Sequence, residues 1–295
     1  MNPNIFREYD IRGVADKDIT EPDAQLIGRA YGTLLRNSGK SSAGVGRDCR
    51  KSSDRFADRF IKGLLESGCD VIDIGVCPTP VLYFAIENLP VEAGAMITAS
   101  HNPPEYNGFK LMNGSDSIHG EGLQEIRTII DREDYAEGSG TLDKADALTP
   151  YKEFLIHNVQ MNGKVRIGID AGNGTGGTTA LPVLREIGCE VHDLYCDMDG
   201  NFPNHEADPT VKKNLEDLIQ LVKKEKLDLG VGYDGDGDRI GVVDENGSVI
   251  YGDQLMVIFA REILERKPGA TFISEVKCSM NMYNDIEQKG GRAVM

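Results

Sequence analysis

The sequence is short of positive charge. Lys and Arg together number 32 against 48 Asp and Glu, which leaves a formal net charge of −16. A chain this acidic repels nucleic acid and anionic membrane surfaces, so neither is an expected partner. Any anion that the chain binds must therefore be met by a local group of basic side chains.

Long apolar runs are also missing from the 295 residues. No stretch approaches the roughly 20 apolar residues of a membrane-spanning helix. The first segment, Met1 to Arg12, is too polar for a secretory signal peptide. We therefore expect a cytoplasmic protein.

Paired cysteine motifs are absent as well. The six cysteines lie far apart, and none forms a C-x-x-C pair. This spacing indicates neither a disulfide framework nor a zinc site, and we interpret the cysteines as buried thiols. They are Cys49, Cys69, Cys77, Cys189, Cys196 and Cys278.

What the sequence does contain is an internal repeat. Residues 64–73 (LLESGCDVID) and 184–193 (LREIGCEVHD) share L, E, G, C, V and D in register. Short apolar runs that end in Asp, at 43–48 and 165–170, precede the two copies. Each copy therefore predicts a strand, a loop, a helix, a glycine turn and a second strand.

A third, shorter copy begins at Ala270, where we align Gly291 and Val294 with Gly68 and Val71. Parallel strands that are joined by helices need crossover connections of this kind. The fold class is therefore predicted to be α/β, built from repeated doubly wound units with parallel or mixed sheets, the third unit incomplete.

Three domains are expected: 1–146, 147–250 and a partial third domain at 251–295. The acidic, Gly-rich stretch 131–149 is interpreted as a linker. The last unit would expose a sheet edge, so we expect the chain to be a piece of a longer protein. Helices are expected at 21–36, 53–66, 122–132, 178–187, 212–225 and 253–266, and strands at 229–233, 240–244 and 249–251.

The loop 98–110, TASHNPPEYNGFK, follows an apolar strand and contains Ser100, His101, Asn102 and Lys110. Its prolines and Asn-Gly fix the backbone, and α/β folds bind ligands at the carboxyl ends of strands. We expect Ser100 to be an exposed loop nucleophile. An ordinary polar turn is the alternative, whereas a Ser-His hydrolase is disfavoured because no G-x-S-x-G elbow is present.

The segment DGDGDR places Asp234, Asp236 and Asp238 at alternate positions of a Gly-containing loop. Three carboxylates this close repel one another unless a hard cation neutralises them. An EF-hand is the main competitor, but Arg239 stands where that loop requires glycine, and the flanks are strand-like. The sequence therefore predicts a metal site here.

Two other segments carry weaker signals. The loop DAGNGTGG at 170–177 formally matches a dinucleotide-binding fingerprint, but a lone match of this kind discriminates poorly. Arg12 lies beside Tyr9 before the first expected helix and is a candidate phosphate ligand because its guanidinium is planar.

In order along the chain, these segments resemble the α-D-phosphohexomutase family, in its phosphomannomutase/phosphoglucomutase branch. The resemblance implies similar α/β units around one cleft. It also implies that phosphate moves between C1 and C6 of mannose or glucose through a bisphosphorylated sugar. It rests on FREYDIRGV, VGRDCRKS, TASHNPPEYNGFK, DAGNGTGG, PNHEADPT, GYDGDGDRIGVVD and EVKC, and covers essentially the whole chain.

The resemblance further implies roles for individual side chains. Ser100 would carry the phosphate, with Mg²⁺ as the cation beside it, a sugar phosphate as substrate and a sugar bisphosphate as activator. The implied metal ligands are Ser100, Asp234, Asp236 and Asp238, the residues assisting catalysis are His101, Lys110 and Arg239, and those binding substrate are Tyr9, Arg12, Asn102 and Lys277.

Lys110 is the first candidate for the general base, on the condition that burial or nearby positive charge lowers its pKa; neutralising phosphate is its competing role. The family's Glu-x-Ser-Gly sugar-recognition loop and distal phosphate domain are not found, so the chain by itself is expected to be inactive. Three alternatives stay open: a phosphoglucosamine mutase, a calcium-binding module, and a sugar-phosphate-binding protein without turnover.

Overall fold

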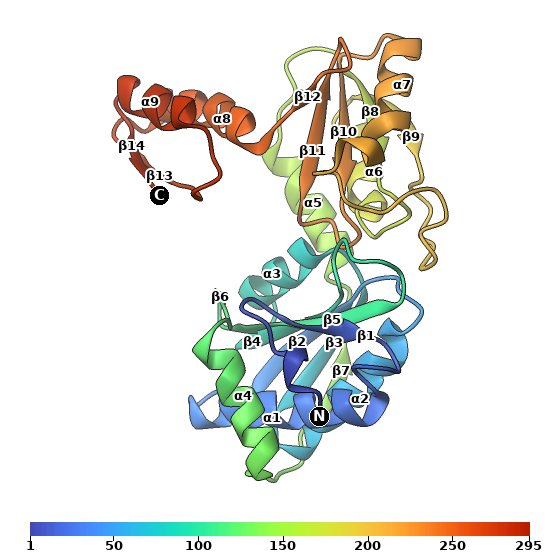
Figure 1. Ribbon diagram of the computed structural model, residues 1–295, viewed down its shortest axis with the longest axis vertical. Helices are drawn as coiled ribbons and strands as arrows, with labels where there is room; N and C mark the ends of the chain where they lie inside the picture. The colour runs from blue at the N-terminus through green and yellow to red at the C-terminus, as the bar shows by residue number, and fades with distance from the viewer.

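The computed structural model describes residues 1–295 and places them in three α/β units in chain order (Figure 1). The first unit is built on a seven-stranded sheet, the second on a five-stranded sheet and the third on a two-stranded sheet. The first two sheets mix parallel and antiparallel strands, so the predicted fold class is confirmed. No helix is both long enough and apolar enough to cross a membrane.

The first sheet runs β1-β5-β4-β2-β3-β7, with β6 added to β5. The three central strands are parallel, and β1 and β5 are antiparallel to their neighbours. The bounds are β1 Ile11–Val14, β2 Ser42–Arg47, β3 Asp70–Val76, β4 Ala93–Ile97, β5 Tyr106–Asn113, β6 Asp116–Ser117 and β7 Leu142–Lys144.

Helices cover both faces of this sheet (Figure 1). On one face an aromatic stack of Tyr31, Phe60, Phe109 and Phe56 forms the centre of the core, and Tyr31 donates its hydroxyl proton to the carbonyls of Gly94 and Met112. The opposite face packs against α3. The helices are α1 Glu21–Asn37, α2 Ser53–Glu66, α3 Thr79–Asn88 and α4 Glu121–Arg132, after a short 3-10 turn, η1 Pro3–Ile5.

The second sheet has the order β12-β11-β10-β8-β9, and the third pairs β13 with β14 in parallel. The strands are β8 Arg166–Asp170, β9 Glu190–Leu194, β10 Leu229–Tyr233, β11 Ile240–Asp244, β12 Val249–Ile250, β13 Thr271–Ile273 and β14 Arg292–Val294. The helices are α5 Leu148–Asn158, α6 Gly177–Glu186, α7 Glu216–Glu225 with η2 Lys212–Leu215 before it, α8 Gly252–Arg266 and α9 Met280–Gln288.

The glycine turn of the repeat recurs in all three units. In the third unit, however, the glycine of the turn lies one residue earlier than predicted. Gly68, Gly188 and Gly290 have φ values of 82°, 100° and 82°. Ala293 of β14 lies opposite Phe272 of β13, and Val71 of β3 lies opposite Ala43 of β2. Ala293 is therefore the third unit's equivalent of Val71. The turn therefore uses Gly290 rather than Gly291, because the left-handed residue is the one that comes two positions after the helix end.

The stretch 131–149 was predicted to be a linker, and this is wrong for part of it. Residues 142–144 form β7, which extends the first sheet along the edge of β3. All three residues are exposed, so the strand lacks the apolar alternation by which strands are usually recognised. Its backbone pairing alone, with Val71 opposite Leu142, places it in the sheet.

Candidate active site

Ser100 follows the carboxyl end of β4 in a left-handed conformation, with φ 53°. Its amide donates to Thr98 Oγ1 at 2.9 Å. The serine was expected to be exposed, but only 1% of it is accessible. The reason is that the second unit packs directly on it: a Cβ added at Gly235 would lie 2.5 Å from the Ser100 carbonyl oxygen.

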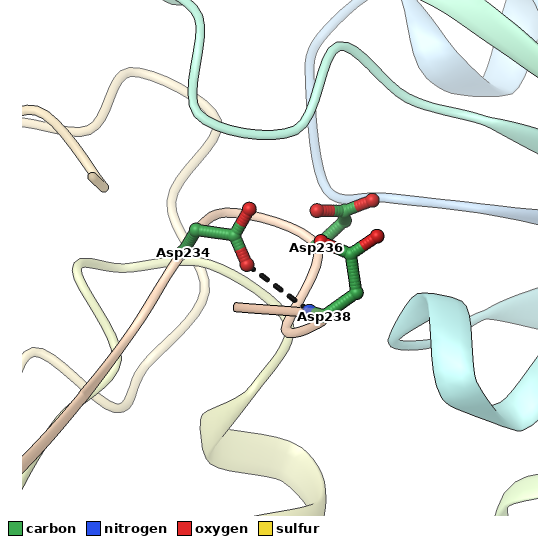
Figure 2. A group of neighbouring side chains, drawn as sticks. All are labelled: Asp234, Asp236 and Asp238. Carbon is green, nitrogen blue, oxygen red and sulfur yellow. Dashed lines mark hydrogen bonds between the residues drawn. The ribbon is translucent and has the colours of Figure 1, made fainter. Parts of the chain in front are cut away.

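The three aspartates lie in the loop that joins β10 to β11 (Figure 2). Asp234 Oδ1 accepts the amide protons of Asp238 at 3.0 Å and Arg239 at 2.9 Å, which folds the loop back on its own first residue. Antiparallel strands flank the loop on both sides. An EF-hand, which needs flanking helices, is therefore excluded.

The serine side chain meets the aspartate loop at Asp234. Ser100 Oγ donates to Asp234 Oδ2 at 2.6 Å, and His101 Nδ1 lies 3.2 Å from the same hydroxyl. The structure thus joins the nucleophile predicted in the first unit to the metal site predicted in the second.

Asp236 is held from the opposite side of the loop. Its Oδ2 accepts protons from Thr79 Oγ1 at 2.6 Å and from Lys110 Nζ at 2.5 Å, and its carbonyl accepts the Thr79 amide proton at 2.8 Å. Lys110 Nζ also lies 2.5 Å from Asp238 Oδ2. Sequence reasoning missed Thr79, because nothing in CPTPVL marks this threonine as a partner of a loop more than 150 residues away.

The residues of this site fit a divalent cation. Carboxylate oxygens of Asp234, Asp236 and Asp238 lie within 4.8 Å of one another. Asp236 Oδ1 is buried and has no hydrogen-bond partner, which is costly for a carboxylate unless an ion binds it. Oxygen donors of this kind are those that hard cations prefer.

The charges of the site shift its pKa values. Burial, followed by the neighbouring charges of Asp236 and Asp238, raises the pKa of Asp234 to about 8. Burial and then Arg239 lower the pKa of His101. Burial would lower the pKa of Lys110, but Asp236 and Asp238 outweigh it, so this pKa is raised. A general base at Lys110 would require a lowered pKa, so this arrangement does not meet the condition that we set for that role.

Three of the remaining predicted residues lie at the edge of the site. Arg12 donates to Asn102 and to Asp10, and its buried Nε has no partner. Arg239 is half exposed, with Nε 3.9 Å from Asp234 Oδ2. Arg12, Asn102 and Arg239 therefore border the site.

Tyr9 and Lys277 are not brought into contact with it. Tyr9 is 74% exposed. Lys277 belongs to the third unit, where it pairs at 3.9 Å with Glu275 and lines a hollow of about 710 Å³ between α8 and α9.

The DAGNGTGG loop has a structural position behind the aspartates. Thr175 donates its amide proton to the Gly235 carbonyl at 3.0 Å and its hydroxyl proton to the same oxygen at 3.2 Å. Gly174 lies so close to Gly235 that an added Cβ would approach that oxygen to 2.5 Å. The glycines thus allow two backbones to pack together, and the loop supports the aspartate loop from behind.

The sequence matches two descriptions of one family. Residues 3–137 match phosphoglucomutase/phosphomannomutase, alpha/beta/alpha domain I, and residues 148–247 match alpha/beta/alpha domain II of the same family. A phosphomannomutase/phosphoglucomutase of Pseudomonas putida is 43% identical over 292 residues, 99% of this chain and 63% of that protein. A phosphoglucomutase of Neisseria gonorrhoeae is 40% identical over 99% of this chain and 64% of its own length.

Solved structures agree with these matches. A crystal structure of a phosphoglucomutase/phosphomannomutase family protein from Burkholderia thailandensis superposes with a TM-score of 0.96 at 39% identity, over 99% of this chain and 65% of that one. The chain thus spans slightly less than two thirds of the length of these relatives.

Proposed function

Because this chain belongs to the phosphoglucomutase/phosphomannomutase family, we propose that it moves phosphate between C1 and C6 of hexose phosphates, with mannose and glucose as the favoured sugars. The observation that carries this proposal is the 2.6 Å hydrogen bond between Ser100 Oγ and Asp234 Oδ2. It places a hydroxyl that can be phosphorylated directly beside three carboxylates that fit a divalent cation.

In the proposed mechanism, Ser100 is phosphorylated in the resting protein. A free hydroxyl of the sugar phosphate attacks the phosphorus, the bond between phosphorus and Ser100 Oγ breaks, and its electron pair returns to Oγ. The bisphosphorylated sugar then turns over and returns its other phosphoryl group to Ser100. The net reaction exchanges the positions of phosphate on one sugar.

The site would balance the negative charge of a phosphorylated Ser100. A phosphoserine carries about −1.5 to −2 at neutral pH. Asp234, Asp236 and Asp238 would hold Mg²⁺ together with an oxygen on Ser100, and the ion would act as a Lewis acid on the transferred group. Lys110, beside Asp236 and Asp238, and Arg239, beside Asp234, add positive charge.

A base must take the proton of the attacking hydroxyl, and His101 is the residue that we propose. Its Nδ1 lies 3.2 Å from Ser100 Oγ, so a neutral imidazole there can take the Ser100 proton when this hydroxyl attacks the bisphosphorylated sugar, and can give it back to Oγ when the phosphoryl group leaves. Lys110, with a raised pKa, is better suited to neutralising phosphate.

The other predicted residues are proposed to bind substrate. Arg12 donates to Asn102 of the serine loop, while Tyr9 and Lys277 present exposed side chains from the first and third units. We also propose domain boundaries at 1–146, 147–250 and 251–295.

The experiment is a mutase assay of the protein, with Mg²⁺ and glucose 1,6-bisphosphate as activator. Mannose 1-phosphate, glucose 1-phosphate and glucosamine 1-phosphate are offered separately, and the 6-phosphates are measured. We expect turnover of the first two that ends when the cation is chelated. Turnover of the amino sugar alone would make the protein a phosphoglucosamine mutase, and binding of all three without conversion would contradict the proposed activity.

A further inference from the structure

Arg50 is a fully buried arginine that makes no hydrogen bond to the three aspartates or to the Ser100 hydroxyl. Its guanidinium donates all five of its protons in hydrogen bonds. Four of them go to backbone carbonyls of the serine loop. The acceptors are Ser100 O at 2.8 Å, Asn102 O at 2.6 Å, Pro103 O at 2.6 Å, Tyr106 O at 3.0 Å and Asp48 Oδ2 at 3.0 Å.

Asp48 fixes the direction of this guanidinium. The carboxylate is itself buried and accepts protons from Thr98 Oγ1 at 2.7 Å and Ser53 Oγ at 2.5 Å, in addition to the Arg50 amide at 3.0 Å. Thr98 in turn accepts the amide proton of Ser100. Asp48 and Arg50 therefore hold the backbone on both sides of Ser100, one through its amide and the other through its carbonyl.

The second unit also contacts Arg50. The ring of Phe202 lies 5.0 Å from the Arg50 guanidinium carbon, in the geometry of a cation–π contact. Phe202 is 9% exposed and comes from the segment between β9 and η2, far from the serine loop in sequence. The same interface brings Gly235 of the aspartate loop onto the Ser100 carbonyl.

We propose that Arg50 is a positioning residue for the phosphoryl-transfer step, which holds Ser100 in its left-handed conformation and so aims Oγ at the aspartates. This inference rests on the proposed function. The physical reason is that a non-glycine residue keeps φ near 53° only where its surroundings impose it. Four carbonyl contacts from one rigid, planar group supply that constraint.

Lysine cannot replace arginine in this role. An ammonium has three donors on a flexible stem and cannot reach four carbonyls and a carboxylate that surround one plane. Arg50→Lys keeps the charge beside Asp48 but releases part of the loop. Since a shift of about 1 Å at a reacting group can cost on the order of a hundredfold in rate, we expect that scale of effect.

Arg47→Lys is the matched control. Arg47 is the last residue of β2, shortly before Arg50, and is also paired with carboxylates, Asp73 at 2.8 Å and Asp54 at 2.5 Å, but it donates nothing to the serine loop. A second variant, Phe202→Leu, keeps apolar bulk over Arg50 while removing the aromatic face. We expect the exchange rate of the serine loop and the kcat of this variant to lie between those of Arg47→Lys and Arg50→Lys.

The first measurement is hydrogen exchange of the amides at 98–108, which needs no activity. We expect at least tenfold faster exchange in Arg50→Lys than in wild type and no change in Arg47→Lys. The second measurement, in the natural protein, is mutase turnover with Mg²⁺. We expect kcat to fall roughly a hundredfold, with KM and Mg²⁺ affinity within threefold of wild type, and restoration of activity in Arg50→Ala by added methylguanidinium.

The two measurements separate the possible failures. If wild type shows no turnover but the serine loop still exchanges faster in Arg50→Lys, the proposed function fails while the positioning role stands. Unchanged exchange in Arg50→Lys would overturn the inference whatever the activity. So would a fall in kcat that Arg47→Lys reproduces, because it would show a general loss of stability.

Discussion

Ser100 Oγ and Asp234 Oδ2 lie 2.6 Å apart although 134 residues separate them in the chain. The serine comes from a loop of the first sheet and the aspartate from a hairpin of the second. Neither unit contains the site alone. The contact therefore depends on how the two units pack, and the tests below probe each side of it.

Replacing Ser100 by alanine removes the hydroxyl that touches Asp234 while leaving the buried backbone contacts of the loop in place. We expect Ser100→Ala to abolish mutase turnover in the natural protein and to leave the circular dichroism spectrum unchanged. Turnover within tenfold of wild type would show that phosphate is carried elsewhere.

Asp236→Asn tests the metal site. The change removes one charge from a buried carboxylate with an unpartnered oxygen, so we expect Mg²⁺ affinity to fall and turnover to drop at least a hundredfold, in line with the several kcal/mol that cations supply in phosphoryl transfer. Asp244→Asn, at the far end of the same hairpin, is the control and should bind the ion normally. Equal affinity in the two variants, measured by calorimetry, would place the cation elsewhere.

Lys110→Met tests the competition between an ammonium and the cation. Lys110 pairs with both Asp236 and Asp238, so it partly neutralises the carboxylates when no ion is bound. Without it we expect Mg²⁺ to bind more tightly and the ion-free chain to unfold at a lower temperature, because like charges are left uncompensated. Lys277→Met is the control. Weaker Mg²⁺ binding in Lys110→Met would indicate that the lysine cooperates with the ion.

His205 predicts a dependence of stability on pH. Both of its ring nitrogens face acceptors, Asp170 Oδ2 at 3.0 Å and the Glu206 carbonyl at 2.8 Å, so the imidazolium satisfies both. The hydrogen bond to Asp170 is the main cause that raises the pKa of His205 above its usual 6.5. The stabilisation is then fully present below about pH 6.5 and is lost as pH rises through the higher folded-state value.

We therefore expect the unfolding temperature of the wild type to fall by a few degrees more than that of His205→Asn between pH 6 and pH 8.5. Thermal unfolding followed by circular dichroism measures this difference. Parallel curves for the two proteins would show that the imidazole is not charged in the fold.

Helices and strands were predicted best where the spacing of the apolar residues and the residues at the ends of the element indicate the same bounds. The helix at 21–36 begins at a Thr20 capping box and is found at Glu21–Asn37, and the hairpin strands at 229–233 and 240–244 have the predicted bounds. α3 was not predicted. Two prolines open it, and its apolar residues pack on a sheet that periodicity alone does not reveal.

The site was predicted less completely, for a related reason. Ser100 and the aspartates belong to loops with recognisable chemistry, whereas Arg50 and Thr79 act through backbone and carboxylate atoms that only the packed units bring near. A buried arginine leaves no periodic signal. It could have been suspected only from the resemblance of the segment VGRDCRKS to the family.

The central claim is that Ser100 holds the transferred phosphate, and intact mass tests it most directly. The natural protein is incubated with glucose 1,6-bisphosphate and Mg²⁺, and its phosphorylated form is then mixed with excess glucose 1-phosphate. We predict a gain of roughly 80 Da located on Ser100, since serine phosphorylation is covalent, and loss of that mass to the sugar within one turnover. Phosphate that stays on the protein, or that appears equally in Ser100→Ala, would contradict the account.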